Sequence, residues 1–206
     1  AYGNAALIAG VVERADAAEI VGGELALTAT VERSREAVEI LMGDVARERN
    51  PYSGEPILRR LDVQRPEIMP EFGSFRATET EHVPAAYLVP SDQIEALNVL
   101  SDHGISWETL ERAETRAVQR FLIDSTRVAE REYQGHRQRV LFGHYEDAEI
   151  RVAAGTAVVR VDQPLGRLIF SLLEPRSDDG LANWNYFDDA LEGVKYYPVM
   201  RAHERR

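Results

Sequence analysis

The chain has 206 residues, of which 44% are hydrophobic and 29% charged, so we expect a globular protein with a real core and no long disordered stretch. Its net charge of -11 makes nucleic acid an improbable partner, because an acidic surface repels phosphate backbones. The absence of cysteine excludes disulfides and cysteine-ligated zinc. No apolar run approaches the roughly 20 residues of a membrane-spanning helix, so no membrane partner is expected.

The first segment is small and apolar from Ala5 to Val12, which predicts a buried strand that ends at Glu13. Gly22 and Gly23 then predict a turn. Because an apolar segment follows Ala1 almost at once, we expect further residues of the same protein upstream. Without the rest of its sheet, the run from Ala5 to Val12 would expose apolar surface. We therefore expect it to pair with another chain or to be poorly ordered.

The next segment, residues 28–48, predicts a helix because Val31, Val38, Leu41 and Val45 recur at helical spacing between charged residues. Asn50-Pro51 ends this element. Prolines recur through residues 51–72, which predicts an irregular linker between two units. The predicted organisation is therefore a first part over residues 1–50, a linker over 51–72 and a second part over 73–206.

The pattern after Gly73 predicts an α+β unit of strands and short helices. Ser91 is expected to cap a helix that ends at His103-Gly104. The predicted strands are 85–89, 117–123, 138–142, 149–152 and 157–161, and the predicted helices are 93–102, 165–173 and 181–191. The chain closes on the apolar run that begins at Tyr196.

A string of motifs lies within this second part. It comprises PAAYLVP from Pro84, HGI from His103, AGT from Ala154, DQPLG from Asp162, LLEPRSDDGL from Leu172, WN from Trp184 and YPV from Tyr197. In order and spacing it resembles the C-terminal module of a group of bacterial zinc-carboxypeptidase-like proteins, over roughly residues 75–201. The resemblance implies an upstream peptidase domain that holds zinc and cleaves peptides, and it is compatible with secretion or a periplasmic location.

The resemblance also bears on the first 50 residues, which it implies are the end of the peptidase domain. In such peptidases a general-base glutamate ends a buried strand, and the matching position here is Glu13. A carboxylate beside a zinc-bound water accepts its proton and passes it to the leaving amine. The alternative is that Glu13 is a solvated strand end or one partner of an ion pair.

The zinc ligands themselves are not found in this sequence. The resemblance calls for a His-x-x-Glu pair and a distant second histidine, but none of the five histidines has glutamate three positions later. They are His82, His103, His136, His144 and His203. The chain alone is therefore expected to hold no zinc and to be inactive, while zinc is expected in the complete protein.

Weaker site candidates remain, each with a structural alternative. His144 and Glu146 could share one strand face as a weak metal site or be polar surface residues, and His103 could ligate metal or cap its helix. Glu174, Asp178 and Asp179 could bind calcium or serve as caps and partners of Arg176 or Arg167. Five aromatic residues could form a platform for sugar or peptide or belong to the core: Trp107, Trp184, Tyr186, Tyr196 and Tyr197.

Two functions follow from these observations. The first is the C-terminal part of a zinc metallocarboxypeptidase-like peptidase, which is not catalytic by itself. Its partner would be the upstream peptidase domain, or a second copy bound through the segment from Ala5 to Val12. The alternative is a non-catalytic binding or stabilising module for peptide, glycan or a partner domain. The predicted fold is mixed α/β and α+β: a terminal strand–helix remnant of an α/β peptidase domain, then a strand-rich α+β module.

Overall fold

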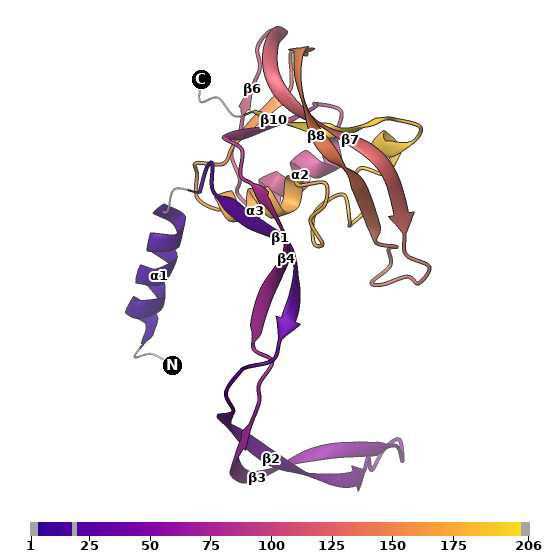
Figure 1. Cartoon of the computed structure of the whole chain (residues 1–206). Coiled ribbons are helices and arrows are strands. Elements are labelled where there is room, and N and C mark those ends of the chain that lie inside the picture. Colours follow the sequence, from indigo (N-terminus) through magenta and orange to yellow (C-terminus); the bar gives the residue numbers. More distant parts are fainter. Residues whose placement is uncertain (1–3, 18–19, 203–206) are drawn as a thin grey trace. The chain divides into compact units, whose positions relative to one another are not determined.

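The computed structural model describes residues 4–17 and 20–202 of the chain (Figure 1). It divides into two compact units, one of residues 1–28 with 77–206 and the other of residues 29–76. We call them the core unit and the ribbon unit. Strands predominate and helices are short, which confirms the mixed, strand-rich α+β class. Among the described residues, no helix is long and apolar enough to cross a membrane.

A six-stranded sheet forms the frame of the core unit, in the order β6-β9-β5-β10-β7-β8. Each neighbouring pair in it is antiparallel. The strands are β5 (Ala86–Val89), β6 (Glu108–Thr109), β7 (Glu114–Val128), β8 (Arg139–Val152), β9 (Ala157–Arg160) and β10 (Tyr196–Ala202). Because β10 inserts between β5 and β7, the last described strand of the chain completes the centre of the sheet.

The main core lies between this sheet and the helices α2 (Ile94–Asp102) and α3 (Gly166–Leu173). Strand alternation directs Tyr87 and Val89 of β5 into the main core, whereas Leu88 packs in a smaller cluster with Val118 and Val152. The strand is buried along its whole length, as both faces of the sheet are covered at this point. Leu100 of α2 and Leu173 of α3 are fully buried in the main core.

The long hairpin β7–β8 is bent at one position. Its register shifts between Ile123 and Ser125, and Gly143 of β8 stands opposite this irregularity. A Cβ atom at Gly143 would overlap the carbonyl oxygen of Leu122 and approach the ring of Phe121 to 2.9 Å. Glycine is therefore required here by the close approach of the two backbones.

The ribbon unit consists mainly of two antiparallel strands, β2 (Val38–Arg49) and β3 (Pro56–Met69). At its base, the backbone N–H of Ser34 donates to the carbonyl of Glu71 (2.8 Å), and the backbone N–H of Glu71 donates to Oγ of Ser34 (3.0 Å). The strands β1 (Glu24–Glu32) and β4 (Ser74–His82) pair with each other, and each belongs partly to both units. No residue from 29 to 76 is buried.

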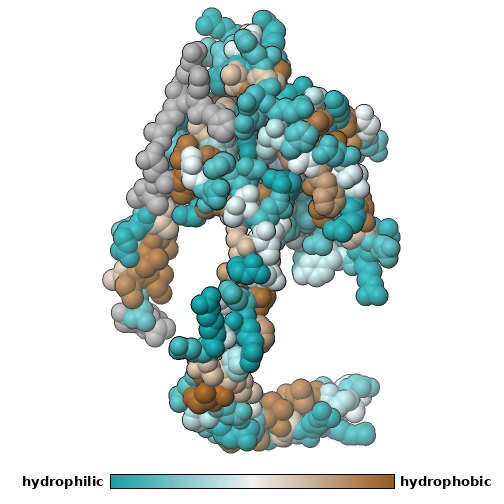
Figure 2. Space-filling view, in the orientation of Figure 1, coloured by the Kyte–Doolittle hydropathy of each residue, from teal (hydrophilic) through white to brown (hydrophobic). Residues whose placement is uncertain are grey.

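The chain opens with the helix α1 (Ala5–Ala17), so the strand predicted from Ala5 to Val12 is wrong. Leu7, Ile8, Val11 and Val12 recur one turn apart, and all four are more than half exposed (Figure 2). A short apolar run does not by itself distinguish a strand from a helix. The helix is favoured here over a strand because its backbone hydrogen bonds are formed within the segment and need no neighbouring strand.

The helix predicted over residues 28–48 is also wrong, because these residues form the end of β1 and the whole of β2. The helical spacing of the valines and Leu41 is coincidental. Thr28, Thr30, Val31, Val38 and Ile40 are β-branched and favour an extended chain, which pairing with other strands then fixes. Asn50-Pro51 does end the element, in a turn where Asn50 Oδ1 accepts the backbone N–H of Tyr52 (2.9 Å).

The irregular linker predicted over residues 51–72 is wrong from 56 to 69, where β3 runs. Pro56 and Pro66 lie within this strand. A two-stranded ribbon leaves one edge of each strand unpaired, so a proline there removes no ladder hydrogen bond. The wider domain division, with residues 1–50 as the end of a peptidase domain, stays a prediction.

The predicted elements of the core unit correspond more closely to the structure. The strands expected within 85–89, 117–123 and 157–161 and the helices at 93–102 and 165–173 are confirmed, and the two strands expected within 138–152 are one strand, β8. Gln93 and not Ser91 is the N-cap of α2. The helix predicted over 181–191 is reduced to turns and a short 3-10 helix, η2 (Asp189–Leu191), since Asn185 adopts a left-handed conformation (φ 70°).

Candidate functional site

Glu13, the predicted general base, lies in α1 and is exposed. The strand end at which it was expected does not exist, so its predicted setting is wrong. Its side chain makes no hydrogen bond or ion pair with any described residue, and none of the histidine contacts involves it. Its catalytic role stays a prediction for the complete protein.

The histidines occupy separate surroundings. His144 lies 3.5 Å from Asp124 and 3.8 Å from Glu146, which confirms that it shares a strand face with Glu146. His103 ends α2, where its backbone N–H donates to the carbonyl of Val99 (3.2 Å). His136 stacks on Trp184 at 4.0 Å between ring centroids, and His82 lies 3.8 Å from Glu24. His203 lies outside the described residues.

No group of three or more histidine or carboxylate side chains comes together within residues 4–17 and 20–202 in a way that could hold a metal ion. The acidic residues proposed for calcium also point to separate partners. Asp179 accepts the indole N–H of Trp184 (2.6 Å), whereas Glu174 is buried and faces the sheet. The expected pairing of Arg176 with this cluster is wrong, because Arg176 binds Glu79 and Glu81 of β4.

Glu174 is the centre of a buried polar network. One carboxylate oxygen accepts Nε of Arg201 (2.8 Å) and the hydroxyl of Tyr87 (2.5 Å). The other accepts the hydroxyl of Tyr145 (3.1 Å) and a second nitrogen of Arg201. The guanidinium of Arg201 also lies 3.5 Å from the ring centroid of Tyr145. Every oxygen lone pair that points into the core therefore has a donor.

Burial governs the ionisation of this network. Burial raises the pKa of Glu174, and Arg201 and the tyrosine hydroxyls only partly oppose it. Burial, together with the neighbouring Glu174, also raises the pKa of Tyr87 and Tyr145 well above the ordinary tyrosine value. Tyr197 has a pKa raised by the same two causes. With Arg201 and Glu174 only 2% and 1% exposed, the network is closed to a ligand.

Glu81 connects β4 to the same network. It lies 2.7 Å from Arg176 and 3.6 Å from Arg201. Although partial burial raises the pKa of Glu81, the backbone N–H of His82 and the two arginines outweigh burial and lower it overall. The ion pairs therefore hold the end of β4 that belongs to the core unit next to the network, and their charges compensate one another.

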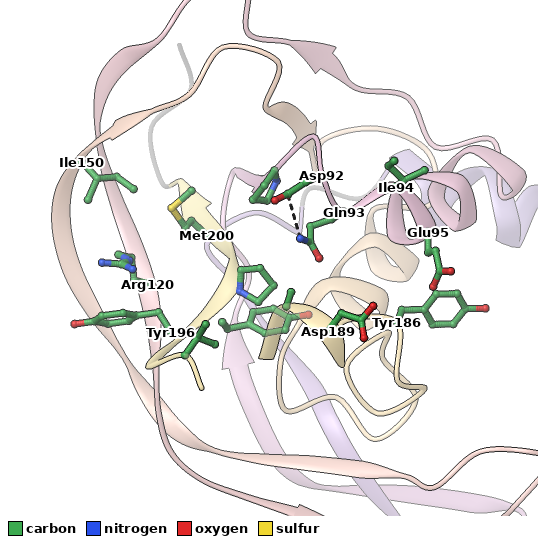
Figure 3. Close-up of a pocket in the computed structure, with 15 residues that line it drawn as sticks. Asp92, Gln93, Ile94, Glu95, Arg120, Ile150, Tyr186, Asp189, Tyr196 and Met200 are labelled. Carbon is green, nitrogen blue, oxygen red and sulfur yellow. Dashed lines mark hydrogen bonds between the residues drawn. The ribbon is translucent and has the colours of Figure 1, made fainter. Parts of the chain in front are cut away.

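An open groove on the core unit is the better candidate for binding (Figure 3). It has a volume of about 720 Å³ and is lined from the start of α2, the turns before β10, and the strands β7, β8 and β10. Its lining residues are Pro90, Asp92, Gln93, Ile94, Glu95, Arg120, Ile150, Tyr186, Asp189, Ala190, Val194, Tyr196, Tyr197, Pro198 and Met200.

The two sides of the groove differ in chemistry. On the sheet side, Arg120 lies over the ring of Tyr196 at 3.6 Å, and the hydroxyl of Tyr196 donates to Glu146 (3.2 Å). On the other side stand the carboxylates of Asp92, Glu95 and Asp189 and the phenol ring of Tyr186 (Figure 3). Because three carboxylates face one guanidinium, the lining of the groove has a net negative charge, which favours a cationic ligand.

The predicted aromatic platform forms only in part. Tyr186, Tyr196 and Tyr197 line the groove, but the body of Tyr197 is buried. Trp107 packs against the main core, and Trp184 stacks on His136 away from the groove lining. Tyr186 therefore remains with an exposed ring, and Tyr196 has one ring face covered by Arg120; the ring of Tyr186 suits contact with a peptide or a sugar ring.

Sequence reasoning missed the partners of Glu174, although a signal was present. Glu174 and Arg201 each interrupt an apolar run, and a charge within such a run is buried only if it is paired. The groove had no comparable signal, because Arg120, Glu95 and Asp189 come from three distant segments.

Searches for similar proteins found no match among family models, curated proteins or solved structures. The zinc-carboxypeptidase-like resemblance therefore depends on the motif string alone.

Proposed function

We propose that this chain is the C-terminal, non-catalytic part of a zinc metallocarboxypeptidase-like protein. The observation that carries the proposal is that several residues of the motif string make structural contacts within the core unit. Gln163 binds both Ser106 and the carbonyl of Arg160, Gly166 lies too close to the Val161 carbonyl for a side chain, and Glu174 is the buried centre of the polar network. Because these motif residues make structural contacts within the core unit, they support the reading of the motif string as that of a folded module.

The remainder of the site belongs, on this proposal, to the upstream peptidase domain, which supplies the zinc ligands. The exposed apolar side chains of α1, namely Leu7, Ile8, Val11 and Val12, suit contact with that domain or with a second copy. Contact there would bring Glu13 toward the zinc-bound water, where its carboxylate accepts a proton. The peptidase-remnant origin of residues 1–50 is part of the same proposal.

The zinc content of the purified 206-residue chain tests its non-catalytic character. After dialysis, elemental mass spectrometry should find near-zero zinc, and the chain with added zinc should release no C-terminal amino acid from a peptide. About one zinc per chain, with release of amino acids, would overturn the proposal. The upstream sequence tests the family: it should contain a His-x-x-Glu pair and a distant histidine, and an unrelated sequence would contradict the assignment.

The role of Glu13 is tested in the complete protein. Glu13→Gln should lower kcat by about 10²–10⁴-fold, the contribution typical of a positioned general base, and should leave the zinc content unchanged. Arg14→Gln is the matched control, since it alters the adjacent position of the same helix and should leave kcat unchanged. Equal activity of the Glu13 variant and the control would remove Glu13 from the mechanism.

A second function is favoured by the groove, which supports a module that binds a peptide with basic side chains. A short lysine- and arginine-containing peptide should shift the backbone NMR signals of residues around Asp92, Glu95 and Asp189. Its affinity should fall with salt, because the charges are exposed. An acetylated peptide of the same sequence should bind at least about tenfold more weakly. Equal binding of both peptides would contradict a charge-selective groove.

A further inference from the structure

The two faces of the β2–β3 ribbon differ in exposure. Residues that pair across the strands share a face, and alternate pairs lie on opposite faces. One face, which we call the open face, contains the pairs Glu39–Ile68, Leu41–Pro66, Gly43–Gln64, Val45–Arg60, Arg47–Leu58 and Arg49–Pro56. The opposite face, which we call the ion-paired face, contains Val38–Met69, Ile40–Glu67, Met42–Arg65, Ala46–Arg59 and Glu48–Ile57.

Apolar side chains are more exposed on the open face. Leu41, Val45, Leu58 and Ile68 are 63%, 57%, 67% and 70% exposed. On the ion-paired face the most exposed are Val38 at 41% and Ile57 at 40%. Figure 2 shows hydrophobic residues at the surface along this ribbon. The open face therefore offers exposed apolar side chains on both sides of the Gly43–Gln64 pair, next to which the register of the two strands shifts.

The charges divide in the same way. On the ion-paired face Arg59 binds Glu48 (2.7 Å), and Arg65 lies 3.0 Å from Asp44 and 3.6 Å from Glu67. On the open face, Arg47, Arg49 and Arg60 lie toward the turn at residues 50–54 and Glu39 lies at the far end. None of these four charges has an ion pair within the described part of the chain.

Such a ribbon is short of stabilising contacts. A two-stranded hairpin is at best marginally stable in water, and it becomes stable when another layer covers its apolar face. On the ion-paired face the charged side chains already have partners within the ribbon. The open face has the apolar area and the unpaired charges. A hollow of about 510 Å³ lies at its centre, lined mostly by residues of this face and also by Met42 and Asp44.

We propose that the open face is a dimer interface with a second copy of this chain, in which two ribbons pack face to face and antiparallel about a two-fold axis near Gly43. A two-fold axis makes the interface self-complementary. It brings Glu39 of each copy level with Arg47 and Arg49 of the other, because these positions lie on opposite sides of Gly43 along β2. The absence of a side chain at Gly43 lets the two backbones approach at the axis, and Val45 of each copy then lies opposite Leu41 of the other.

The four exposed apolar side chains of each copy, which are Leu41, Val45, Leu58 and Ile68, then form a core between the two ribbons. The two ribbons together make a small two-layer β structure. The three arginines favour this antiparallel arrangement and oppose a parallel one, since a parallel packing would bring arginine against arginine. The inference is independent of the zinc-carboxypeptidase-like proposal, because it uses only residues of the ribbon unit.

Sedimentation velocity on the whole chain tests this dimer, from about 1 to about 100 µM, the range in which mass action reveals a moderate affinity. The expected result is a species of twice the chain mass whose association weakens with salt. Glu39→Arg should weaken association at least about tenfold, and the charge exchange of Glu39→Arg with Arg47→Glu, the position directly opposite across the axis, should restore it to within about threefold. Leu41→Asp should abolish it.

Glu55→Arg is the matched control, as it makes the same change in charge within the turn and should leave association unchanged. A chain that stays monomeric at the highest concentration would overturn the proposal. So would a dimer that Leu7→Asp in α1 disrupts and Glu39→Arg does not, since the helix would then be the contact. Failure of the charge exchange to restore association would exclude the antiparallel arrangement.

Discussion

The core unit and the ribbon unit are both built mainly from strands, but they differ in how far their side chains are buried. In the core unit, helices cover the main face of a six-stranded sheet, and even a carboxylate and a guanidinium are enclosed. In the ribbon unit no side chain of residues 29–76 is buried. Pairing of strands alone therefore gives a regular backbone without a core, and stability comes only when a second layer is added.

The largest effect is expected at Glu174. Glu174→Gln should lower the free energy of unfolding by up to about 3–5 kcal/mol, because it leaves the buried Arg201 with only the more distant carboxylate of Glu81, 3.6 Å away, as counter-charge. Urea unfolding followed by tryptophan fluorescence measures it, with the exposed Glu192→Gln as control. The combined change of Glu174→Gln and Arg201→Met should recover part of the loss, and a single-variant loss below about 1 kcal/mol would contradict the role of the network.

A pair of leucines compares the two units directly. Leu100→Ala in α2 should cost about 2–5 kcal/mol, since it leaves a cavity in a fully buried position. Leu58→Ala in the ribbon should cost within about 0.5 kcal/mol in a dilute, monomeric sample, because its side chain is exposed. Thermal unfolding of both variants provides the comparison, and similar losses would mean that the ribbon has a core of its own.

A smaller effect, confined to alkaline solution, is expected from Tyr87, Tyr145 and Tyr197. Their pKa is raised in the folded state, mainly by burial, so they keep their protons when the unfolded chain begins to lose them at about pH 10. The stability they contribute is complete below pH 10 and is lost as the pH rises further. Absorbance at 295 nm should show the exposed tyrosines ionising in the folded protein and these three ionising only together with unfolding. Ionisation of all eight tyrosines before unfolding would contradict their burial.

The difference in burial also explains why the elements of the core unit were predicted from the sequence better than those of the ribbon unit. Buried elements such as β5 and α3 carry short apolar runs bounded by proline and glycine, and burial enforces the pattern. In the ribbon no face is buried, so the apolar residues of β2 follow no enforced period and their spacing imitated a helix. For α1, the sequence analysis recognised the apolar residues. Composition alone did not distinguish a helix from a strand in so short an apolar segment.

The candidate site was predictable only where it is local in sequence. The proximity of His144 and Glu146 followed from strand alternation, and the end of α2 at His103-Gly104 followed from helix-capping preferences. The pairing of Glu174 with Arg201, and the meeting of Arg120 with Glu95 and Asp189 in one groove, depend on where β10 enters the sheet. Such contacts are set by topology, which one sequence does not specify.

The hydrogen bonds between Ser34 and Glu71 mean that the chain leaves and re-enters the base of the ribbon at adjacent points. Whatever lies between these two residues is a closed loop, and the entropy of closing a loop grows only slowly with its length. Segments of very different length and sequence can therefore be exchanged at this position at small thermodynamic cost. The base of the ribbon is thus a suitable port for grafting a recognition peptide or a fluorescent domain.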